Sequence, residues 1–448
     1  MPVWQPVSDQ TGEGAGARVR RGGVPRSGTR SERRPPAAAS GTDTLGGTLS
    51  TLSALPAWQG RLAMMAACTL PGVLMRLSGV HLPPPLAMVV FGGAVMAAAF
   101  MLASAAEAAE LDVSPGIAVA GIAFVAVLPE YVIEVYFAFT GQVEFVTASL
   151  TGSTRLLLAF AVGMPALASF VLVRRGKPRV ETVDIDPRRR IDLGIICAAS
   201  LYAPLIALRG HLAWQDSIVL IGLYVVYMRR IASGDPEPPH LVGIAAELGK
   251  LQKRQRRRWV VGLMVYAAVA VLVTAEPFAH SVLLTGTTVG ISPYLLVQWL
   301  VPLATEMPEL VIAFVLVTHG RAGQAVAVLL SSAVSQWTFA LGTLPLAFMA
   351  GAGQGPLPLL AREQVEVLLT MGQGLLAVAL LVTLRLGRRD AMLMLVLFAV
   401  QLAIPSVAIR AAMTLGYLVL AIDIFMSERW AIPTLARALR ARSADAAP

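Results

Sequence analysis

The stretch from Ala304 to Gly320, ATEMPELVIAFVLVTHG, decides how this chain folds. It places a threonine, two glutamates and a proline inside a segment that is otherwise apolar and long enough to cross a bilayer. An uncompensated carboxylate is costly at that depth, so an acid inside a membrane segment is a functional hypothesis by default. A second stretch of the same kind, VAVLPEYVIEVYFAFTG, runs from Val125 to Gly141.

The composition indicates a membrane protein. Of the 448 residues, 56% are hydrophobic and only 14% are charged, whereas a soluble protein carries roughly a quarter charged residues. Apolar runs of about 20 residues, the length that spans a bilayer as a helix, recur along most of the chain. We therefore predict an all-α polytopic fold of about 12 transmembrane helices.

Twelve apolar segments follow the polar N-terminal stretch. They are Arg61–Val80, Leu86–Glu110, Gly116–Phe139, Phe145–Val173, Ile191–Leu208, Trp214–Tyr227, Trp259–Leu284, Ile291–Val317, Ala325–Met349, Val365–Leu384, Ala391–Ala408 and Ala411–Met426. Threading them from a cytoplasmic N-terminus places all strongly basic connections on one side, as the positive-inside rule requires. We expect a multi-pass plasma-membrane protein with both termini in the cytoplasm.

The net charge of +9 does not indicate nucleic acid as a partner. The basic residues lie in short loops and tails, where they act as topology signals. Scattered charges such as Arg209, Arg362 and Arg410 fall on the opposite side. The expected partners are the lipid bilayer and transported cations, with no nucleic acid and no cofactor. The sequence leaves the oligomeric state open.

These segments divide the chain into six parts. They are a disordered basic tail (1–57), an extra N-terminal transmembrane helix (58–85), a first repeat (86–232), a basic cytoplasmic loop (233–258), a second repeat (259–408), and an extra transmembrane helix with a basic cytoplasmic tail (409–448).

The two repeats are recognised by alignment of their proline-glutamate motifs. When Pro129-Glu130 is set over Pro308-Glu309, glycines, serines and a Phe-Ala pair stay in phase across two predicted helices. An odd number of spans separates the copies, so the two motif helices run in opposite directions. Inverted repeats of this kind are typical of secondary transporters, whose site lies between the repeats near the bilayer midplane. Each proline also frees a backbone carbonyl one turn earlier.

This paired pattern, a Pro-Glu helix followed by a Gly-Ser helix, resembles the Ca²⁺/cation antiporters, the sodium/calcium exchanger superfamily. The leaders LDVSPGIAVAG and VGISPYLLVQW before the two motifs fit the same family. The resemblance covers roughly 100–228 and 259–408. It implies two inverted five-helix halves, to which the first and last helices are additions, and the exchange of one cation against another.

The resemblance implies a set of cation ligands. The two essential glutamates of the family correspond to Glu130 and Glu309, and Thr305, Ser153 and Ser332 match its hydroxyl positions. Gln336 stands where the family has an Asn or Asp in one copy, whereas Leu157 stands there in the other. Glu306 replaces a serine of the family and adds an acid. Such oxygen atoms, with backbone carbonyls, could supply the six to eight ligands of Ca²⁺.

Two further charged residues are expected to modulate this site. Glu134 lies one turn after Glu130 on the same helix face, where it would either handle protons or pair with Arg155. Arg155 itself has no counterpart in the family, and a buried guanidinium beside the site could act as a tethered cation that replaces one ion. The two prolines, Pro129 and Pro308, would kink the motif helices.

The leading interpretation is a secondary active antiporter that exchanges Ca²⁺, or another cation, against Na⁺ or H⁺ by alternating access around Glu130 and Glu309. A proton-coupled exchanger of altered ion specificity is the alternative, since lost hydroxyls weaken a Na⁺ site. A degenerate exchanger acting as a scaffold or sensor also stays open. An intramembrane enzyme is disfavoured, because no HExxH or G-x-x-x-x-G-K-[ST] motif is present.

Overall fold

The computed structural model describes residues 57–112, 115–171, 182–233, 241–353 and 355–440. The chain divides into two units, Met1–Ala54 and Leu55–Pro448. The first unit, which holds nearly all of the predicted disordered tail, lies outside the described residues. Everything below concerns the second unit.

The described chain is built almost wholly of helices. In order they are α2 (Ala57–Ser78), α3 (Pro84–Ala109), α4 (Pro115–Phe139), α5 (Val143–Val171), η1 (Pro187–Arg189), α6 (Arg190–Arg209), α7 (Trp214–Ala232), α8 (Gly243–Gly249), α9 (Lys253–Val289), α10 (Pro293–Thr305), α11 (Met307–Thr318), α12 (Ala322–Ser335), the π-helix η2 (Gln336–Ala340), α13 (Leu341–Gly351), α14 (Ala361–Leu381), α15 (Arg388–Ala403), α16 (Val407–Ser427) and α17 (Ile432–Arg440).

Each of the twelve predicted segments coincides with a helix or with a broken helix. Among the described residues, seven helices are long and apolar enough to cross a membrane, or eight if the bent pair α10–α11 counts as one span. The predicted number of twelve is therefore not confirmed by this count. α15 has only 16 residues, and α7 carries Asp216, Arg229 and Arg230 within its 19 residues.

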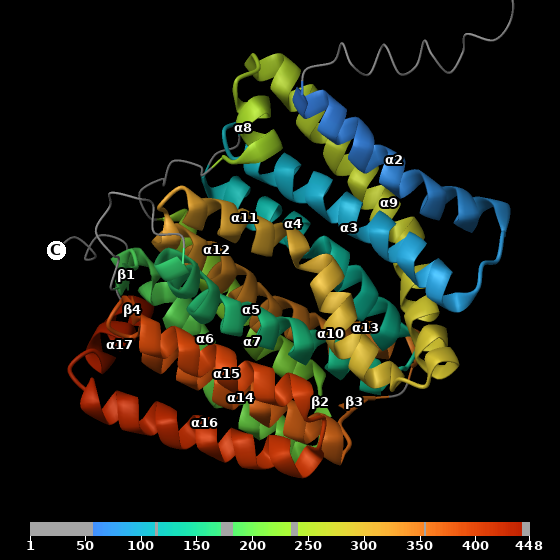
Figure 1. Cartoon of the computed structure of the whole chain (residues 1–448). Helices are drawn as coiled ribbons and strands as arrows, with labels where there is room; N and C mark the ends of the chain where they lie inside the picture. Colours follow the sequence, from blue (N-terminus) through green and yellow to red (C-terminus); the bar gives the residue numbers. More distant parts are fainter. Residues whose placement is uncertain (1–56, 113–114, 172–181, 234–240, 354, 441–448) are drawn as a thin grey trace, which may run out of the picture. The chain divides into compact units, whose positions relative to one another are not determined.

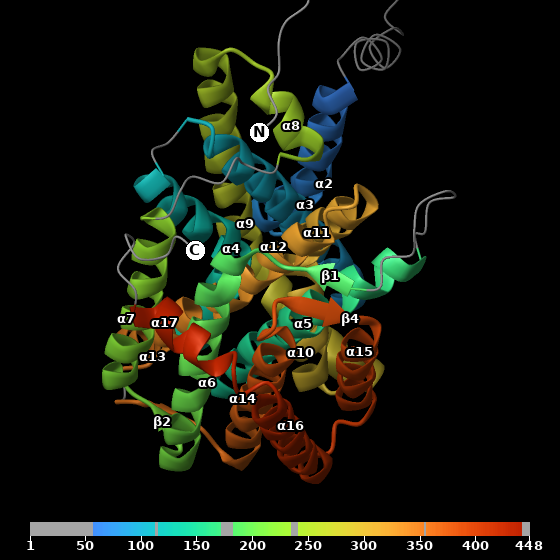
Figure 2. The ribbon, with the colours of Figure 1, turned by 90° about the vertical axis from the view of Figure 1, so that its left-hand side faces the viewer.

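Four short strands close the two ends of the helical unit. β1 (Thr182–Asp184) pairs with β4 (Arg385–Gly387), and β2 (His211–Leu212) pairs with β3 (Leu357–Pro358), both antiparallel. The two pairs lie at opposite ends of the helices (Figure 1), and β1 and β4 lie side by side in the rotated view (Figure 2). Two loops predicted on the basic side thus meet at one end, and two predicted on the other side meet at the opposite end.

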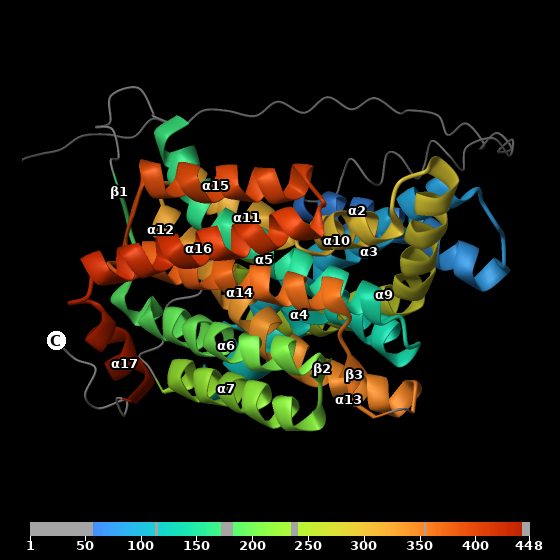
Figure 3. The same ribbon diagram turned by 90° about the horizontal axis from the view of Figure 1, so that it is seen from below.

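α5 occupies the centre of the helical unit. It packs against α10, α12, α14 and α15, while α2, α3 and α9 pack together to one side. The view from below shows α14 between α16 and α6, with α7 beyond α6 (Figure 3). The central helix is therefore shielded on several faces by helices that come from the second half of the chain.

Two irregular helices interrupt the second half. α10 and α11 meet at a bend of 54°, with Pro308 in the first turn of α11, because a proline cannot donate the hydrogen bond that would continue the helix. η2 forms a π-helical turn between α12 and α13. By contrast, α4 continues through Pro129 as one helix.

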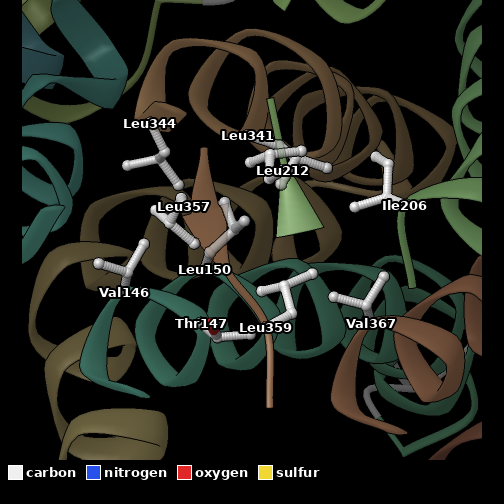
Figure 4. A pocket seen from close by; sticks show the side chains of 10 residues that line it. All are labelled: Val146, Thr147, Leu150, Ile206, Leu212, Leu341, Leu344, Leu357, Leu359 and Val367. Carbon is white, nitrogen blue, oxygen red and sulfur yellow. The ribbon is translucent and has the colours of Figure 1, made fainter. Parts of the chain in front are cut away.

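A small cavity lies between α5, α13, α14 and the β2–β3 pair (Figure 4). Its volume is about 20 Å³, and its lining is aliphatic apart from Thr147. A space of this size holds about one water molecule, and aliphatic walls offer a cation no ligands. This cavity is therefore not suited to bind a cation.

Candidate cation site

Four glutamates are buried where the two motif helices approach each other. Glu130 and Glu134 lie on α4, Glu306 lies at the break between α10 and α11, and Glu309 lies in the first turn of α11. Their exposed fractions are 2%, 0%, 5% and 8% in that order. Glu130 interacts electrostatically with Glu134 and Glu306, and Glu306 does so with Glu309. The fold thus gathers acids from positions far apart in the sequence.

Gln336 links the two motifs directly. Its Nε2 donates to Glu130 Oε2 and, at 3.1 Å, to Glu306 Oε1. Gln336 is fully buried and is the first residue of η2. π-helical turns occur frequently at functional sites, and here the turn begins with the side chain that joins α4 to the α10–α11 break. This amide-to-carboxylate bridge is the central contact of the site.

Several oxygen atoms around this bridge have no hydrogen-bond partner although they are buried. They are Glu130 Oε1, both carboxylate oxygens of Glu134, Glu309 Oε2 and Gln336 Oε1. A buried polar atom without a partner costs free energy, so such atoms need a reason to persist. Carboxylate and amide oxygens are the ligands that hard cations such as Ca²⁺ prefer. The clustering of these oxygen atoms in one place is what a site for reversible cation binding requires.

The three predicted hydroxyl ligands lie on the surrounding helices. Ser153 of α5 is fully buried, rests against the Glu130 carboxyl and donates to Ser149 O and Leu150 O, both at 3.1 Å. Thr305 donates to Val301 O at 3.1 Å, within its own helix. Ser332 is half-buried, one turn before Gln336 on α12.

The carboxylates do not form a closed acidic cage in this conformation. Within the part of the chain that the structure describes, no group of three or more His, Cys, Asp and Glu residues is arranged to hold one metal ion. Glu130 and Glu306 instead approach each other as a pair through Gln336. A cation bound here would need amide, hydroxyl and backbone oxygens as well as carboxylates.

Arg155 does not belong to this cluster. It is fully buried, and its Nη2 forms an ion pair with Glu366 of α14 at 2.8 Å. Its Nε donates to Thr151 O at 2.9 Å, and its guanidinium stands over the Trp299 ring at 5.3 Å. The expected role as a tethered cation is therefore wrong, because the guanidinium pairs with Glu366, outside the cluster of four glutamates. The alternative in which Glu134 pairs with Arg155 is wrong for the same reason.

Arg410 also departs from its predicted place in a solvated connection. It lies in the first turn of α16, only 1% exposed, and forms an ion pair with Glu366. Its Nη2 donates to Gln298 Oε1 at 2.9 Å. In the sequence, Arg410 stands between two apolar segments, and an arginine at such a position is typical of a loop that connects two membrane helices. Only the packing of α16 on α14 reveals that the side chain is buried.

Glu107 is a further acid near the site and was not singled out from the sequence. It lies on α3, accepts a hydrogen bond from the backbone N–H of Val242 and interacts electrostatically with Glu309. No motif links it to the site, because Glu309 is about two hundred residues away in the chain. It extends the acidic cluster from Glu309 towards the loop before α9.

Comparison with known proteins places this architecture among transporters. Residues 84–231 and 259–407 match the family described as "Sodium/calcium exchanger protein". The solved structure of the H⁺/Ca²⁺ exchanger CAX is 33% identical, with a TM-score of 0.81, and the match covers 86% of this chain and 98% of CAX.

A second similar structure supports the fold alone. The structure of native YfkE is 16% identical, with a TM-score of 0.56, over 81% of this chain and 99% of YfkE. No curated protein matches the chain. α16 begins at the last residue of the family match, so Arg410 lies beyond it.

Proposed function

Because this chain belongs to the sodium/calcium exchanger protein family and is a membrane cation antiporter, we propose that it exchanges Ca²⁺ against H⁺. The choice of ions rests on the similarity to the H⁺/Ca²⁺ exchanger CAX and on the chemistry of the buried acids. Carboxylates bind either Ca²⁺ or protons, and both states leave the buried group neutralised. Na⁺ as the counter-ion is the runner-up.

The contact that carries the proposal is the Gln336 bridge between Glu130 and Glu306. It joins the two motif helices through one amide. When one carboxylate gains or loses a ligand, the shared amide changes the hydrogen bonding of the other carboxylate as well. In this mechanism Glu130, Glu306 and Glu309 hold the divalent cation together with Gln336 Oε1, Ser153, Ser332 and Thr305. Glu134 accepts protons when the cation leaves.

The broken helix strengthens such a site. Glu306 and Glu309 lie at the N-terminal end of α11, where the helix dipole favours negative charge. Pro308, in the same turn, fixes the break and exposes the carbonyls at the end of α10. Pro129 occupies the equivalent place on α4. The protein thus offers carboxylates and free carbonyls at a single point, as transporters with discontinuous helices do.

We further propose that the chain contains two repeats of inverted topology and crosses the membrane twelve times. Asp216 and Asp390 cap the starts of α7 and α15 in the same way, each accepting from the backbone N–H three residues earlier. β1 and β2 flank α6 as β3 and β4 flank α14, and each strand pair takes one strand from each half. A two-fold axis between the halves accounts for these pairs.

In the cell, we expect this arrangement in the plasma membrane with both termini in the cytoplasm. The β1–β4 end follows the arginine-rich connection before α6 and would face the cytoplasm. The extra helices at the two ends, α2 and α16, would complete the twelve spans around the two five-helix halves.

Transport by the purified full-length protein in proteoliposomes tests the function. We expect an outward-directed proton gradient, but no Na⁺ gradient, to drive ⁴⁵Ca²⁺ uptake into the vesicles. Glu130→Gln and Glu309→Gln should each lower uptake about 100-fold, because each removes a ligand charge. The control is Glu247→Gln on α8, whose exposed carboxylate pairs with Lys250 and which should transport normally.

Three results would redirect the proposal. Uptake driven only by Na⁺ would replace the counter-ion. Absence of uptake with either gradient would favour a scaffold or sensor. Uptake that survives Glu309→Gln would place the cation elsewhere.

A further inference from the structure

A second set of buried carboxylates lies outside the cation site, one in each half of the chain. Asp192 of α6 is fully buried, and Glu366 of α14 is 1% exposed. One sequence offset relates Asp192 to Glu366, Tyr227 of α7 to Gln401 of α15, and the capping Asp216 to Asp390. The two carboxylates therefore occupy equivalent positions in the proposed repeat.

Asp192 connects the first half to a helix of the second. The Tyr227 hydroxyl donates to Asp192 Oδ1 at 2.8 Å, and the hydroxyl of Ser331 on α12 donates to the same oxygen at 3.2 Å. Arg189 donates to Ser331 Oγ at 3.4 Å. Asp192 thus fixes α12 one residue before Ser332 and five residues before Gln336.

Glu366 makes the reciprocal connection. Its Oε2 accepts from Arg155 of α5 at 2.8 Å and from Gln298 at 3.1 Å, and its Oε1 accepts from Arg410. Gln401 of α15 accepts from the same Arg155 at 3.4 Å. Glu366 thus fixes α5 two residues after Ser153. In each case a carboxylate of one half holds the serine-bearing helix of the other.

The packing of whole helices follows the same crossed pattern. α5 packs against α14 and α15, whereas α12, η2 and α13 pack against α6 and α7. The two carboxylates lie within these crossed interfaces. Both are buried acids that join the halves outside the cation site, so they are placed to control the positions of the proposed ligands.

We propose that Asp192 and Glu366 are paired positioning residues, which fix α12 and α5 and thereby the ligands Ser332, Gln336 and Ser153, and that the Asp192 connection is the one that releases during transport. The role in transport rests on the proposed function, whereas the fixing of α12 by Asp192 and of α5 by Glu366 does not.

The asymmetry between the two connections decides which one releases. The hydrogen bonds to Asp192 Oδ1 come from neutral hydroxyls, the charge of Arg189 acts on this carboxylate electrostatically, and its Oδ2 has no hydrogen-bond partner. Glu366 is held by two buried guanidinium groups, and charge-assisted hydrogen bonds are roughly twice as strong as neutral ones. α12 is therefore easier to free from α6 and α7 than α5 is from α14.

Hydrogen–deuterium exchange of the full-length protein tests the connection without transport. Asp192→Asn should speed backbone exchange about fivefold in α12, in the other half of the chain, and leave α5 unchanged. Glu366→Gln should do the opposite. The matched control is Asp216→Asn, because Asp216 is equally buried but bonds only within α6, α7 and their connection, to Tyr202, Arg209 and Ala213.

Transport then tests the positioning role. Asp192→Asn should raise the KM for ⁴⁵Ca²⁺ about tenfold, with a maximal rate within about twofold of wild type. Loss of a residue that orients cation ligands typically lowers affinity by this amount. Asp192→Glu should restore most of the affinity. If Glu366→Gln does not fold, it is replaced by the variant Arg155→Met/Glu366→Gln/Arg410→Met, which removes all three charges of this ion-pair cluster together.

Two outcomes would overturn the inference. In the first, exchange in α12 is the same in Asp192→Asn and Asp216→Asn. In the second, wild type transports but Asp192→Asn lowers only the maximal rate at unchanged KM, which is the signature of lost folded protein. Failure of wild type to transport would reject the proposed function and leave the exchange result standing.

Discussion

Gly152 shows how a single residue sets the distance between two helices at the site. A Cβ atom at this position would lie 1.9 Å from Gln298 O of α10, far inside any allowed contact. Only glycine therefore lets α5 approach α10 so closely, as small residues do at helix contacts in membranes. The neighbouring Ser153 lies against the Glu130 carboxyl.

Gly152→Ala should separate α5 from α10 and lower stability by about 1–3 kcal/mol, the usual cost of overpacking. The control is Gly262→Ala on α9, where nothing lies within 4 Å of the added Cβ and alanine favours the helix by about 1 kcal/mol. Thermal unfolding in detergent should show a lower Tm for the first variant and an equal or higher Tm for the second. A normal Tm for Gly152→Ala would mean that α5 and α10 can separate without loss.

The limits of sequence reasoning are clearest at the arginines. Glu130, Glu306 and Glu309 could be grouped from the sequence, because a proline motif and its duplicate mark them, whereas Gln336 was indicated only by the resemblance to the exchanger family. Arg155 lies only two residues after Ser153, and proximity in sequence wrongly suggested proximity to the site. Its counter-charge, Glu366, is more than two hundred residues away, and no local pattern encodes that pairing.

At the scale of helices, irregular geometry distinguishes the two halves. The sequence predicted a kink at each of the two motif prolines, because proline removes a helical hydrogen bond. α10 and α11 bend by 54° at the break beside Pro308, whereas α4 continues through Pro129 as one helix. The π-turn η2 has no such marker: the residues Gln336–Ala340 read as ordinary helix. In the first copy Leu157 stands in place of Gln336, so only the second half supplies an amide to the site.

Gln336→Leu, which copies the residue of the first half, should disconnect Glu130 from Glu306 and raise the KM for ⁴⁵Ca²⁺ at least about tenfold. It would also leave buried carboxylate oxygens without a donor, which is costly. Gln324→Leu, on the same helix but three turns earlier, should transport like wild type. Equal kinetics for the two variants would contradict the role given to the bridge.

At the scale of the molecule, α6, α7, α14 and α15 form a frame that joins the halves. The β1–β4 and β2–β3 pairs tie the segments that flank these helices. α6 and α14 also pack directly, so closely that a Cβ on Gly374 would lie 2.6 Å from Ser200 Oγ. Transport that moves α12 against this frame needs no separation of the strands.

A disulfide across the β1–β4 pair tests whether the frame stays intact during transport. Asp184 and Arg385 are direct partners in the register and are both exposed, and antiparallel neighbours about 4.5–5.5 Å apart at Cα fall in the range that a disulfide bridges. Asp184→Cys/Arg385→Cys, in a background that lacks Cys68 and Cys197, should transport at about the same rate oxidised or reduced, since the strands do not part. The cross-link should also raise Tm, because it restricts the unfolded chain. If oxidation stopped exchange and reduction restored it, the halves would have to separate at this end. The moving boundary would then lie within the frame rather than between the frame and α12.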